Sequence, residues 1–407
     1  MTLWWGQHKY LSSAQRGMKV LLISNYRPDR QQSMLRYAEM LHRELSARGY
    51  DIRIVHPPVV LGGIAFLPGP LKKWIGYVDK YVFGLRYLRK QVCNVDLIHV
   101  CDHSNAMYLQ CAGNKPALIT CHDLLAIFAA RGVYPNVRTG FTGRVLQHWI
   151  AASLSRAKHV ICVSKKSQDD LEVLFPGSRS RTRVIHHHLN WNYSQSPIDA
   201  ITNAKKQSGL ESEAEYFLHV GGNQWYKNRL GVMRIFAALR KYLRFKNVKL
   251  VMAGKPWTPE MRQYAASSEL VNEMIERVEV SNEQLQALYS GAIALLFPSL
   301  EEGFGWPVLE AQACGCPVIT SSRAPMTEIA GKAAFFIDPE DPENAAEMIA
   351  DHISDLSVLS IAGFKNLARF TKDGMINAYI KFYEEVASKE NLMALNNPSA
   401  SRPITGK

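Results

Sequence analysis

Short, almost wholly apolar runs recur along the chain, and they form two separate series. The first series starts at Met18, Asp51, Val95, Ala117 and His159, and the second at Tyr216, Lys249, Glu276, Ala292, Pro317 and Ala333. Continuous apolarity, rather than alternation, is typical of parallel strands that are covered on both faces. Helical patterns separate the runs, such as the one from Ser33, which Gly49 is placed to end. Alternating strands and helices predict doubly wound α/β units.

A polar stretch at 189–214, rich in Ser and Asn, separates the two series and is interpreted as a linker. With 407 residues, the chain is long enough for two cores of roughly 200 residues each. The predicted fold class is α/β, with two Rossmann-like parallel-sheet domains facing each other across a cleft. The predicted divisions are an N-terminal domain at 18–195, a C-terminal domain at 210–372, a helix at 373–390 packing back towards the N-terminal domain, and flexible ends at 1–17 and 391–407.

Positive charge is concentrated in the first half of the chain. Residues 1–200 hold 26 Lys and Arg against 12 Asp and Glu, and residues 201–407 hold 22 against 24, so the halves carry +14 and −2. A basic half can face nucleic acid, an anionic membrane or a phosphate-bearing substrate. Composition does not choose between these partners.

The sequence predicts neither a secretory leader nor a membrane span. The residues before Met18 lack an apolar stretch of the needed length, and no uncharged apolar run reaches about 18 residues. The seven cysteines form no CxxC pair and mostly lie in or beside apolar runs, so we expect reduced packing residues. These features predict a cytoplasmic protein.

The most informative motif is PSLEEGFGWPVLEAQACGCPVITSS, at 298–322. It places Glu302 and Glu310 eight positions apart, with Gly303 and Gly305 between them. Glycines let backbone amides approach a ligand, and a helix starting there directs its free N–H groups and positive dipole end at an anion. A diphosphate is the natural occupant. The carboxylate of Glu310 can accept hydrogen bonds from paired hydroxyls such as those of ribose, and Glu302 can hold hydroxyls of a sugar.

The motif resembles that of glycosyltransferase family 4, in which two glutamates are separated by seven residues. The likeness extends to SNEQLQALYSGAIALLFP before the motif and to DPEDPENAAEMI after it. The resemblance implies the GT-B fold and sugar transfer from a nucleotide diphosphate donor. It also implies that Glu310 binds the donor ribose, that Glu302 contacts the transferred sugar, and that the amides of Phe304 and Gly305 lie near the sugar or phosphates.

A second candidate site lies in HVGGNQWYKNRLGV, from His219. Lys227 stands just before a predicted helix, an unfavourable place for a cation, which indicates a bound anion. The resemblance implies that this lysine neutralises the leaving diphosphate, where a fixed cation stabilises the transition state more than the ground state. Many family members have an arginine where this chain has Asn223, so compensation by Arg229 is left open. Gly222, Asn223 and Arg229 are counted as donor-binding residues.

The third candidate site follows the strand-like run ALITC. His122 and Asp123 come after it, at the sheet edge where ligands of open parallel sheets settle. The family often has His-Asp here, and the resemblance places the histidine near the transferred sugar. The loop after the first strand lacks the family's paired glycines, so phosphate contacts there fall to Ser33 at its helix start. His122 joins Lys227 and Glu302 in the predicted catalytic set, and Asp123 and Ser33 join the donor-binding set.

Three consecutive histidines at 186–188 end the last strand of the first series and raise the question of a metal site. Adjacent residues of a strand point to opposite faces, so they are poorly placed to share an ion. In our interpretation, Lys227 and helix termini carry the charge of the diphosphate. We therefore expect no metal and no cofactor, with the nucleotide sugar as co-substrate.

The region 59–91 combines a short apolar segment with interleaved basic and aromatic residues. These are Lys72, Lys73, Lys80, Arg86, Arg89 and Lys90, with Trp74, Tyr77, Tyr81, Phe83 and Tyr87. Such a combination suits a membrane interface, although the segment is too short to span a bilayer. The hypothesis is a surface that lies on anionic lipid or admits a lipid-linked acceptor. The alternative is a helix packed on its own domain with a basic outer face.

Together these features predict a retaining hexosyltransferase of mannosyl or glucosyl type. Its acceptor is unidentified, with a lipid-linked molecule or a growing polysaccharide as candidates. Two alternatives stay open: a non-catalytic basic protein of the same fold that binds membrane or polyanion, and a sugar-nucleotide epimerase, which the two-glutamate motif disfavours. We expect no nucleic-acid partner and a cytoplasmic protein with peripheral membrane contact.

Overall fold

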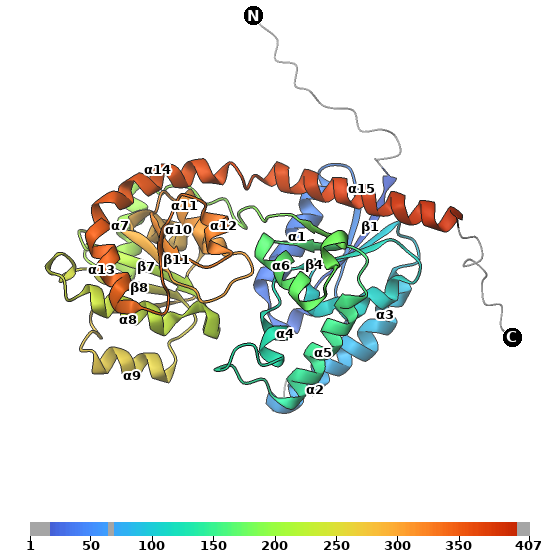
Figure 1. Cartoon of the computed structure of the whole chain (residues 1–407), viewed down its shortest axis with the longest axis horizontal. Helices are drawn as coiled ribbons and strands as arrows, with labels where there is room; N and C mark the ends of the chain where they lie inside the picture. Colours follow the sequence, from blue (N-terminus) through green and yellow to red (C-terminus); the bar gives the residue numbers. More distant parts are fainter. Residues whose placement is uncertain (1–16, 64–68, 397–407) are drawn as a thin grey trace, which may run out of the picture.

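The computed structural model describes residues 17–63 and 69–396, and for 69–73 and 390–396 it describes the backbone alone. Two parallel six-stranded sheets lie side by side, each with helices on both faces (Figure 1). The predicted α/β class with two doubly wound sheets is confirmed. Most of the predicted flexible ends, 1–16 and 397–407, lie outside the described residues.

The first sheet has the strand order β2-β1-β3-β4-β5-β6. Its strands are β1 (Lys19–Ile23), β2 (Asp51–Val55), β3 (Leu97–Val100), β4 (Ala117–Cys121), β5 (Val160–Cys162) and β6 (Thr182–Val184). Its helices are α1 (Gln32–Ser46), α2 (Gly69–Val78), α3 (Gly84–Gln91), α4 (Leu125–Ala130), α5 (Phe141–Ser155) and α6 (Lys165–Leu174), with a π-helical turn at Asp79–Phe83. The central strands have the most continuous apolar runs, because both of their faces are covered.

The second sheet has the strand order β12-β11-β10-β7-β8-β9. Its strands are β7 (Tyr216–Gly221), β8 (Lys249–Gly254), β9 (Met274–Val278), β10 (Ala294–Phe297), β11 (Val318–Ser321) and β12 (Phe335–Ile337). Its helices are α7 (Ile198–Gln207), α8 (Arg229–Leu239), α9 (Pro259–Ser267), α10 (Asn282–Gly291), α11 (Trp306–Ala313), α12 (Met326–Ala330), α13 (Pro342–His352) and α14 (Leu356–Leu367). Short 3-10 turns occur at Arg27–Asp29, His103–Ala112, Ser178–Arg181, Trp225–Lys227, Leu243–Phe245 and Ile353–Asp355.

The stretch 189–214, interpreted as a plain linker, contains the helix α7. The polar composition of this stretch conceals one inward-facing side of the helix. Ala204 of α7 is buried in the core of the second domain, and Ile201 packs close to Gly291 at the end of α10. The helix is therefore part of the second domain, and only the residues before it connect the domains.

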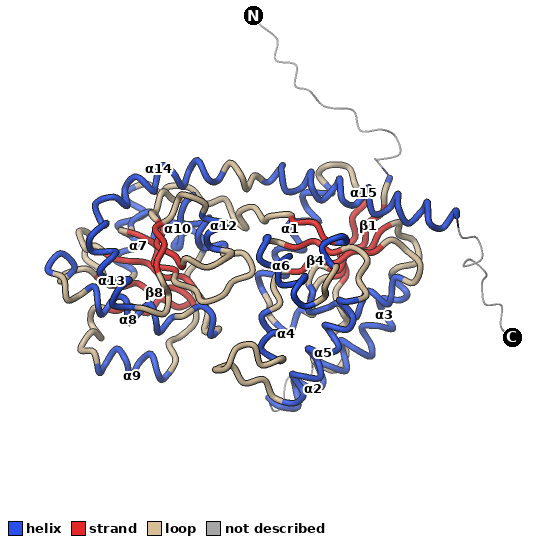
Figure 2. The backbone as a smooth tube through the Cα atoms, viewed as in Figure 1, coloured by secondary structure: helices blue, strands red, loops and turns tan. Residues whose placement is uncertain are grey.

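The last helix, α15 (Lys372–Asn396), returns to the first domain. Figure 2 shows α14 and α15 running along one side of the molecule, from the second domain back over the first. Met375, Ile376 and Tyr379 are buried in the same core as the apolar face of α1. Two buried hydrogen bonds fix the contact, one between the hydroxyls of Tyr37 and Tyr379 at 2.6 Å and one between the Tyr383 hydroxyl and His99 Nδ1 at 2.6 Å. The helix is thus one wall of the first domain.

The region 59–91 divides between interior and surface. Asp79 is fully buried and accepts hydrogen bonds from the Tyr26 hydroxyl and from the amides of 60–62. Lys80 forms an ion pair with Asp29 at 2.8 Å and lies over three tyrosine rings, so its charge is satisfied within the domain. In contrast, Trp74 is exposed. Residues 64–68 and the side chains of Lys72 and Lys73 lie outside the described part of the region.

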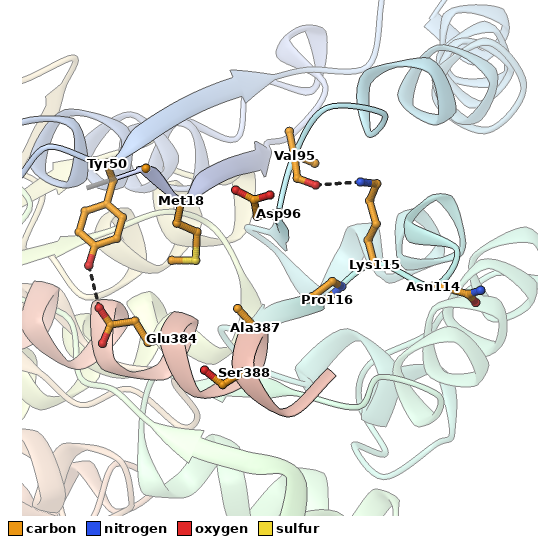
Figure 3. A pocket seen from close by; sticks show the side chains of 11 residues that line it. Met18, Tyr50, Val95, Asp96, Asn114, Lys115, Pro116, Glu384, Ala387 and Ser388 are labelled. Atoms are coloured by element: carbon orange, nitrogen blue, oxygen red, sulfur yellow. Dashed lines mark hydrogen bonds between the residues drawn. The ribbon is translucent and has the colours of Figure 1, made fainter. Parts of the chain in front are cut away.

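A cavity of about 900 Å³ opens at the amino ends of the strands of the first sheet (Figure 3). Asp96 and Lys115 lie just before β3 and β4, and Glu384 of α15 closes one side by accepting a hydrogen bond from Tyr50 at 3.0 Å. Lys115 donates to the backbone of Val95 at 2.9 Å. Ligands of open parallel sheets bind at the opposite, carboxyl ends. The functional site is therefore expected at the carboxyl ends.

None of the helices within 17–63 and 69–396 combines the length and apolarity needed to cross a bilayer. All seven cysteines are free thiols, and six of them are buried, which confirms their interpretation as reduced packing residues. Cys93 is the exposed one.

Candidate functional site

The two domains touch where the loop after β4 meets the loop after β10. A Cβ added to Gly303 would stand 2.1 Å from the carbonyl oxygen of His122, so only glycine permits this approach. The Gly303 carbonyl also accepts a hydrogen bond from Ser164 Oγ at 2.7 Å, across the domain boundary. From the sequence, Gly303 was expected to let the backbone approach a ligand. In the structure, it lets the backbones of the two domains approach each other.

Lys227 and Glu302 form an ion pair at the carboxyl end of the second sheet. Lys227 Nζ lies 2.6 Å from Glu302 Oε1, which also accepts a hydrogen bond from Ser299 Oγ at 3.0 Å. Glu302 is buried, and Lys227 Nζ lies 5.2 Å from the centroid of the Phe297 ring. A lysine that is held by a single carboxylate keeps two further N–H donors for an anion. Two predicted catalytic residues are thus brought together.

Glu310 lies in the second turn of α11, with its carboxylate held from two sides. The Tyr289 hydroxyl donates to Oε2 at 2.9 Å and Asn190 Nδ2 donates to Oε1 at 3.1 Å. Burial raises the pKa of Glu310, and the two hydrogen bonds offset only part of that effect. Asn190 belongs to the segment between the domains, so the carboxylate is fixed by that segment as well as by its own domain.

The loop before α11 presents backbone donors. Gly305 is the N-cap of α11 at φ = 98°, a left-handed conformation suited to glycine. Within the described residues, the amides of Gly303, Phe304 and Gly305 have no protein acceptor. The side chain of Phe304 is buried against the rings of His187 and Trp306, so only its backbone can meet a ligand. Free amides at a helix start form an anion-binding group.

His122 is buried, and both of its ring nitrogens face protein groups. Nε2 lies 2.9 Å from the carbonyl oxygen of Cys101, and Nδ1 lies 3.3 Å from His187 Nε2. Burial lowers the pKa of His122 and of His187, so both rings are neutral near pH 7. Because a carbonyl only accepts, Nε2 of His122 carries the hydrogen, and Nδ1 accepts from His187. The ring is stacked in place rather than presented by a nitrogen to the cleft.

Asp123 and Ser33 both belong to the first domain but contact different parts of the second. Asp123 packs against Gly303 and accepts a hydrogen bond from the Leu125 amide at 3.1 Å. Ser33, near the start of α1, lines a pocket of about 100 Å³ together with Trp306, the first residue of α11. Two helix N-termini therefore open into one pocket. It is smaller than typical small-molecule sites of about 300 Å³ or more.

Asn223 and Arg229 tie the loops after β7 and β8 together. Asn223 Nδ2 donates to the Pro256 carbonyl at 2.7 Å, and Arg229 donates to the Asn223 side chain and, at 2.8 Å, to the Lys255 carbonyl. Arg229 is buried, and its Nε and Nη2 have no partner among the described residues. Gly222 directly follows β7 and is partly exposed. The contacts of the buried Arg229 are therefore with the loops themselves, and they hold these loops in place.

The three histidines at 186–188 take separate partners. His186 Nε2 lies 2.7 Å from Glu328, His187 stacks on Trp306, and the His188 carbonyl accepts from the Trp306 indole at 3.0 Å. Within the described residues, no group of three or more His, Cys, Asp or Glu side chains is arranged to hold a metal ion. The histidines instead line the boundary between the domains.

Glu328 joins the domains in a way that sequence reasoning missed. This residue of α12 accepts the backbone N–H groups of Lys165 at 2.8 Å and Lys166 at 3.3 Å, at the start of α6 in the other domain. Its carboxylate thus caps a helix across the boundary. Burial acts to raise the pKa of Glu328, but the hydrogen bonds from His186 and the α6 amides outweigh it, and the pKa is lowered.

Replacing Glu328 with glutamine is expected to destabilise the protein by about 1 kcal/mol near neutral pH. Because the folded-state pKa lies below the ordinary value of 4.5, the contribution is full above pH 4.5 and is lost as the pH falls through the folded-state pKa. Urea unfolding of both proteins at a series of pH values measures this difference. A difference that stays constant down to acid pH would contradict the assignment.

A further charged cluster lies at the boundary between the domains. Lys166 Nζ lies 2.6 Å from Asp170 and 3.4 Å from Glu301, and burial raises the pKa of both carboxyls. Tyr134 and Trp225 also meet across the boundary, with ring centroids 4.5 Å apart. Glu301 directly precedes Glu302 of the motif, but nothing in the sequence predicts its contact with Lys166.

Comparison with known protein families covers most of the chain. Residues 34–190 match the model described as Glycosyltransferase Family 4, and residues 200–369 match the model described as Glycosyl transferases group 1. The O-antigen chain mannosyltransferase RfbU of Salmonella typhimurium is 27% identical over 307 residues, which cover 75% of this chain and 78% of that protein. The O-antigen chain mannosyltransferase B of Escherichia coli is 27% identical over 255 residues, covering 62% and 65%.

A solved structure of the same architecture is Alr3699/HepE of Anabaena, in complex with UDP and glucose. It superimposes with a TM-score of 0.68 at 16% identity, covering 90% of this chain and all of that chain. At this identity the likeness concerns the fold. The two matched models meet between 190 and 200, where the segment that carries Asn190 connects the domains.

Proposed function

Since the chain belongs to glycosyltransferase family 4 and has the GT-B fold, we propose a specific sugar transfer for this glycosyltransferase. The enzyme moves a mannosyl group from a nucleotide diphosphate sugar onto a growing polysaccharide, with retention of configuration. The observation that carries the proposal is the buried Lys227–Glu302 pair beside the free amides before α11. This arrangement can bind an anion whose charge increases during the reaction.

The choice of mannose rests on the relatives. Two of them are named O-antigen chain mannosyltransferases, one of which aligns over most of its length with this chain. Their names also favour a polysaccharide acceptor. A glucosyl donor is the second candidate, and nucleotide release from a panel of mannosyl and glucosyl donors separates the two.

Breaking the bond between the anomeric carbon and the phosphate oxygen builds negative charge on the nucleotide diphosphate. Lys227 and the amides of Phe304 and Gly305 stabilise that charge more in the transition state than in the ground state. Glu302 then exchanges its contact with Lys227 for hydroxyls of the sugar. Glu310, already ordered by Tyr289 and Asn190, accepts the ribose hydroxyls.

Retention is what the resemblance to the family implies, and among the described carboxylates at the junction we find none placed to act as a free nucleophile. Glu302 is paired with Lys227 and Asp123 is bonded to an amide, so neither is placed as a covalent nucleophile. The acceptor oxygen therefore bonds to the anomeric carbon on the face that the phosphate leaves, and the acceptor proton passes to the leaving phosphate. An α-linked donor gives an α-linked product. No metal enters this scheme, so we expect activity to persist in EDTA.

Nucleotide release from a panel of GDP-, UDP- and ADP-sugars tests the proposal, with lipid extract present and absent. We expect release from one GDP- or UDP-hexose only, with EDTA making no difference. A sugar-nucleotide epimerase would interconvert donors without releasing nucleotide. A non-catalytic binding protein would show salt-sensitive binding to polyanions and no saturation by one nucleotide. Either result would overturn the proposed transfer.

The first domain also presents a surface suited to a membrane that carries the acceptor. Trp74 of α2 and Phe141 of α5 are large apolar residues with 55% and 80% exposure. The two helices lie at the same end of the domain in Figure 1, and the contact of Tyr81 with Trp149, at 5.0 Å, joins the segment after α2 to α5. The surrounding half of the chain is basic, which favours anionic lipid. We therefore include peripheral contact with an anionic membrane in the proposal.

The double substitution of Trp74 and Phe141 by serine is expected to weaken binding to phosphatidylglycerol vesicles by at least tenfold. Each apolar side chain contributes about 1.5 to 3 kcal/mol when it is removed from water. Cosedimentation with vesicles measures the change, and Leu243→Ser, at an 84% exposed position of the second domain, is the matched control. Equal binding of the control and the double variant would contradict a membrane role for this end.

A further inference from the structure

A second cavity, of about 410 Å³, lies at the carboxyl ends of β7, β8 and β9. Its walls are largely apolar and come from Val220, Pro256, Val278, Val280 and Leu285. This is the edge of a doubly wound sheet at which nucleotides bind. Its volume is within the range of small-molecule sites, and flat apolar walls suit a planar ring.

The cavity adjoins the groups already assigned to the donor. Gly222 lines it, and a Cβ at the preceding Gly221 would stand 3.6 Å from Lys227 Cβ. Leu285 and Tyr289 are four residues apart on α10, so they lie on the same side of that helix, and Tyr289 bonds Glu310. A ligand with its diphosphate at Lys227 and its ribose at Glu310 therefore has its base nearest this cavity.

Two opposite charges stand at the rim of the cavity. Gly254 of β8 and Val278 of β9 are paired in the parallel ladder, so Lys255 and Glu279 are the first residues beyond it on neighbouring strands. Both line the cavity and both are exposed. Within the described residues, neither side chain has an ion pair or hydrogen bond of its own, although they are neighbours. Each is therefore available to a ligand.

Glu279 is held in an unusual backbone conformation. Its φ is 58°, in the left-handed region that non-glycine residues seldom occupy. Glycine would adopt this conformation without strain. The chain nevertheless has a glutamate here, at a cost in backbone strain. Strain of this kind is concentrated at ligand-binding positions.

We propose that the cavity takes the base of the donor and selects guanine, with Glu279 and Lys255 as the specificity-determining residues. The inference rests on the proposed function, because it supposes a nucleotide donor. The Glu279 carboxylate accepts from the N1–H and N2–H groups of guanine, and the Lys255 ammonium donates to O6. The donor is then a guanosine diphosphate sugar.

The alternative bases present the wrong edge to this pair. Uracil has one N–H between two carbonyl oxygens, so a carboxylate that accepts its N3–H meets the like partial charge of a carbonyl. In the same orientation, adenine has a ring nitrogen acceptor in place of the N1–H of guanine and a C–H in place of its 2-amino group, so the carboxylate loses both hydrogen bonds. A site built on charge-assisted hydrogen bonds rejects analogues that leave its groups unpaired.

Titration calorimetry with GDP, UDP and ADP tests the selection in wild type, Glu279→Gln and Lys255→Met. We expect wild type to bind GDP at least tenfold more tightly than UDP or ADP. Glu279→Gln should weaken GDP about tenfold or more while changing UDP little, and Lys255→Met should weaken GDP as well. Glu260→Gln, an exposed carboxylate of α9 away from the cavity, is the matched control and should leave all affinities unchanged.

Glu279→Gly separates binding from folding. It should raise the thermal midpoint, because glycine accepts the left-handed conformation, yet it should lose the GDP preference. Tighter binding of UDP or ADP than of GDP overturns the inference and leaves the proposed transfer standing. A GDP preference that Glu279→Gln leaves intact also overturns it. Binding of no nucleotide by a folded wild type overturns both the inference and the proposed function.

Discussion

Replacing Lys227 with methionine is expected to lower kcat/KM for the nucleotide sugar by about 100- to 1000-fold. Methionine keeps the length of the side chain and removes its charge, so the leaving diphosphate loses the cation that stabilises it. Lys227 also neutralises Glu302, which is buried and 2.6 Å away. The loss should therefore appear mainly in kcat, because the interaction is strongest when charge has built up on the phosphate. Nucleotide release under saturating donor measures it.

Stability must be separated from chemistry in this variant. A buried carboxylate without its partner costs about 3 to 5 kcal/mol, so a fall in activity alone would not identify the cause. The double variant Lys227→Met and Glu302→Gln restores neutrality and should regain stability while remaining inactive. Lys241→Met removes a lysine whose ion pair with Glu343 is exposed, and it should behave as wild type. Retention of most of the wild-type kcat by Lys227→Met would exclude the lysine as the catalytic cation.

The substitution Glu310→Gln is expected to weaken donor binding about 10- to 100-fold. The carboxylate already receives hydrogen bonds from Tyr289 and Asn190, so its remaining lone pairs point to the bound ribose in our proposal. A glutamine in its place turns one acceptor into a donor, and a lost charge-assisted hydrogen bond is worth about 1.5 to 3 kcal/mol. Titration with the nucleoside diphosphate measures the affinity directly.

Two controls sharpen this result. Tyr289→Phe keeps the carboxylate but loosens it, so its effect should be several times smaller than that of Glu310→Gln. A deoxyribose donor, which lacks one of the paired hydroxyls, should lose affinity for wild type and little for Glu310→Gln. If the deoxy donor is equally impaired in both proteins, Glu310 does not bind the ribose.

The fold was predictable because its signal is local. Runs such as those from Met18 and Ala117 are apolar at every position, and the strands they form are covered on both faces, so composition and placement agree. The helix at α7 escaped the same reasoning. Its buried face is narrow, with Ala204 as its inward residue, and a polar stretch with such a face gives a weak periodic signal.

The candidate site was predictable as far as it depends on single loops. The motif at 298–322 predicted the helix start at α11, because the strand, the loop and the helix follow one another in the sequence. The pairing of Lys227 with Glu302 was not predicted, although both residues were assigned to the catalytic set. It depends on β7 and β10 being neighbours in the sheet, and the order of the strands cannot be derived from the local sequence pattern.

Contacts between the domains were beyond sequence reasoning. Glu328 caps α6, and Gly303 admits the backbone of His122, across a boundary whose shape follows from both folds together. His122 itself shows the difference. Its position after β4 indicated a side chain in the cleft, whereas the neighbouring carbonyl of Cys101 and the ring of His187 determine where its nitrogens point.

Because α15 packs on the first domain, the first domain cannot complete its folding before the second domain has been synthesised. Domains generally fold as they leave the ribosome, the N-terminal one first. Here the face of the first sheet that carries Leu22 and Leu118 is covered in part by Ile376 and Tyr379, which are synthesised after the whole second domain. The domain that is made first is therefore completed only after the second one, and its nascent chain exposes an apolar sheet face until α15 has been synthesised.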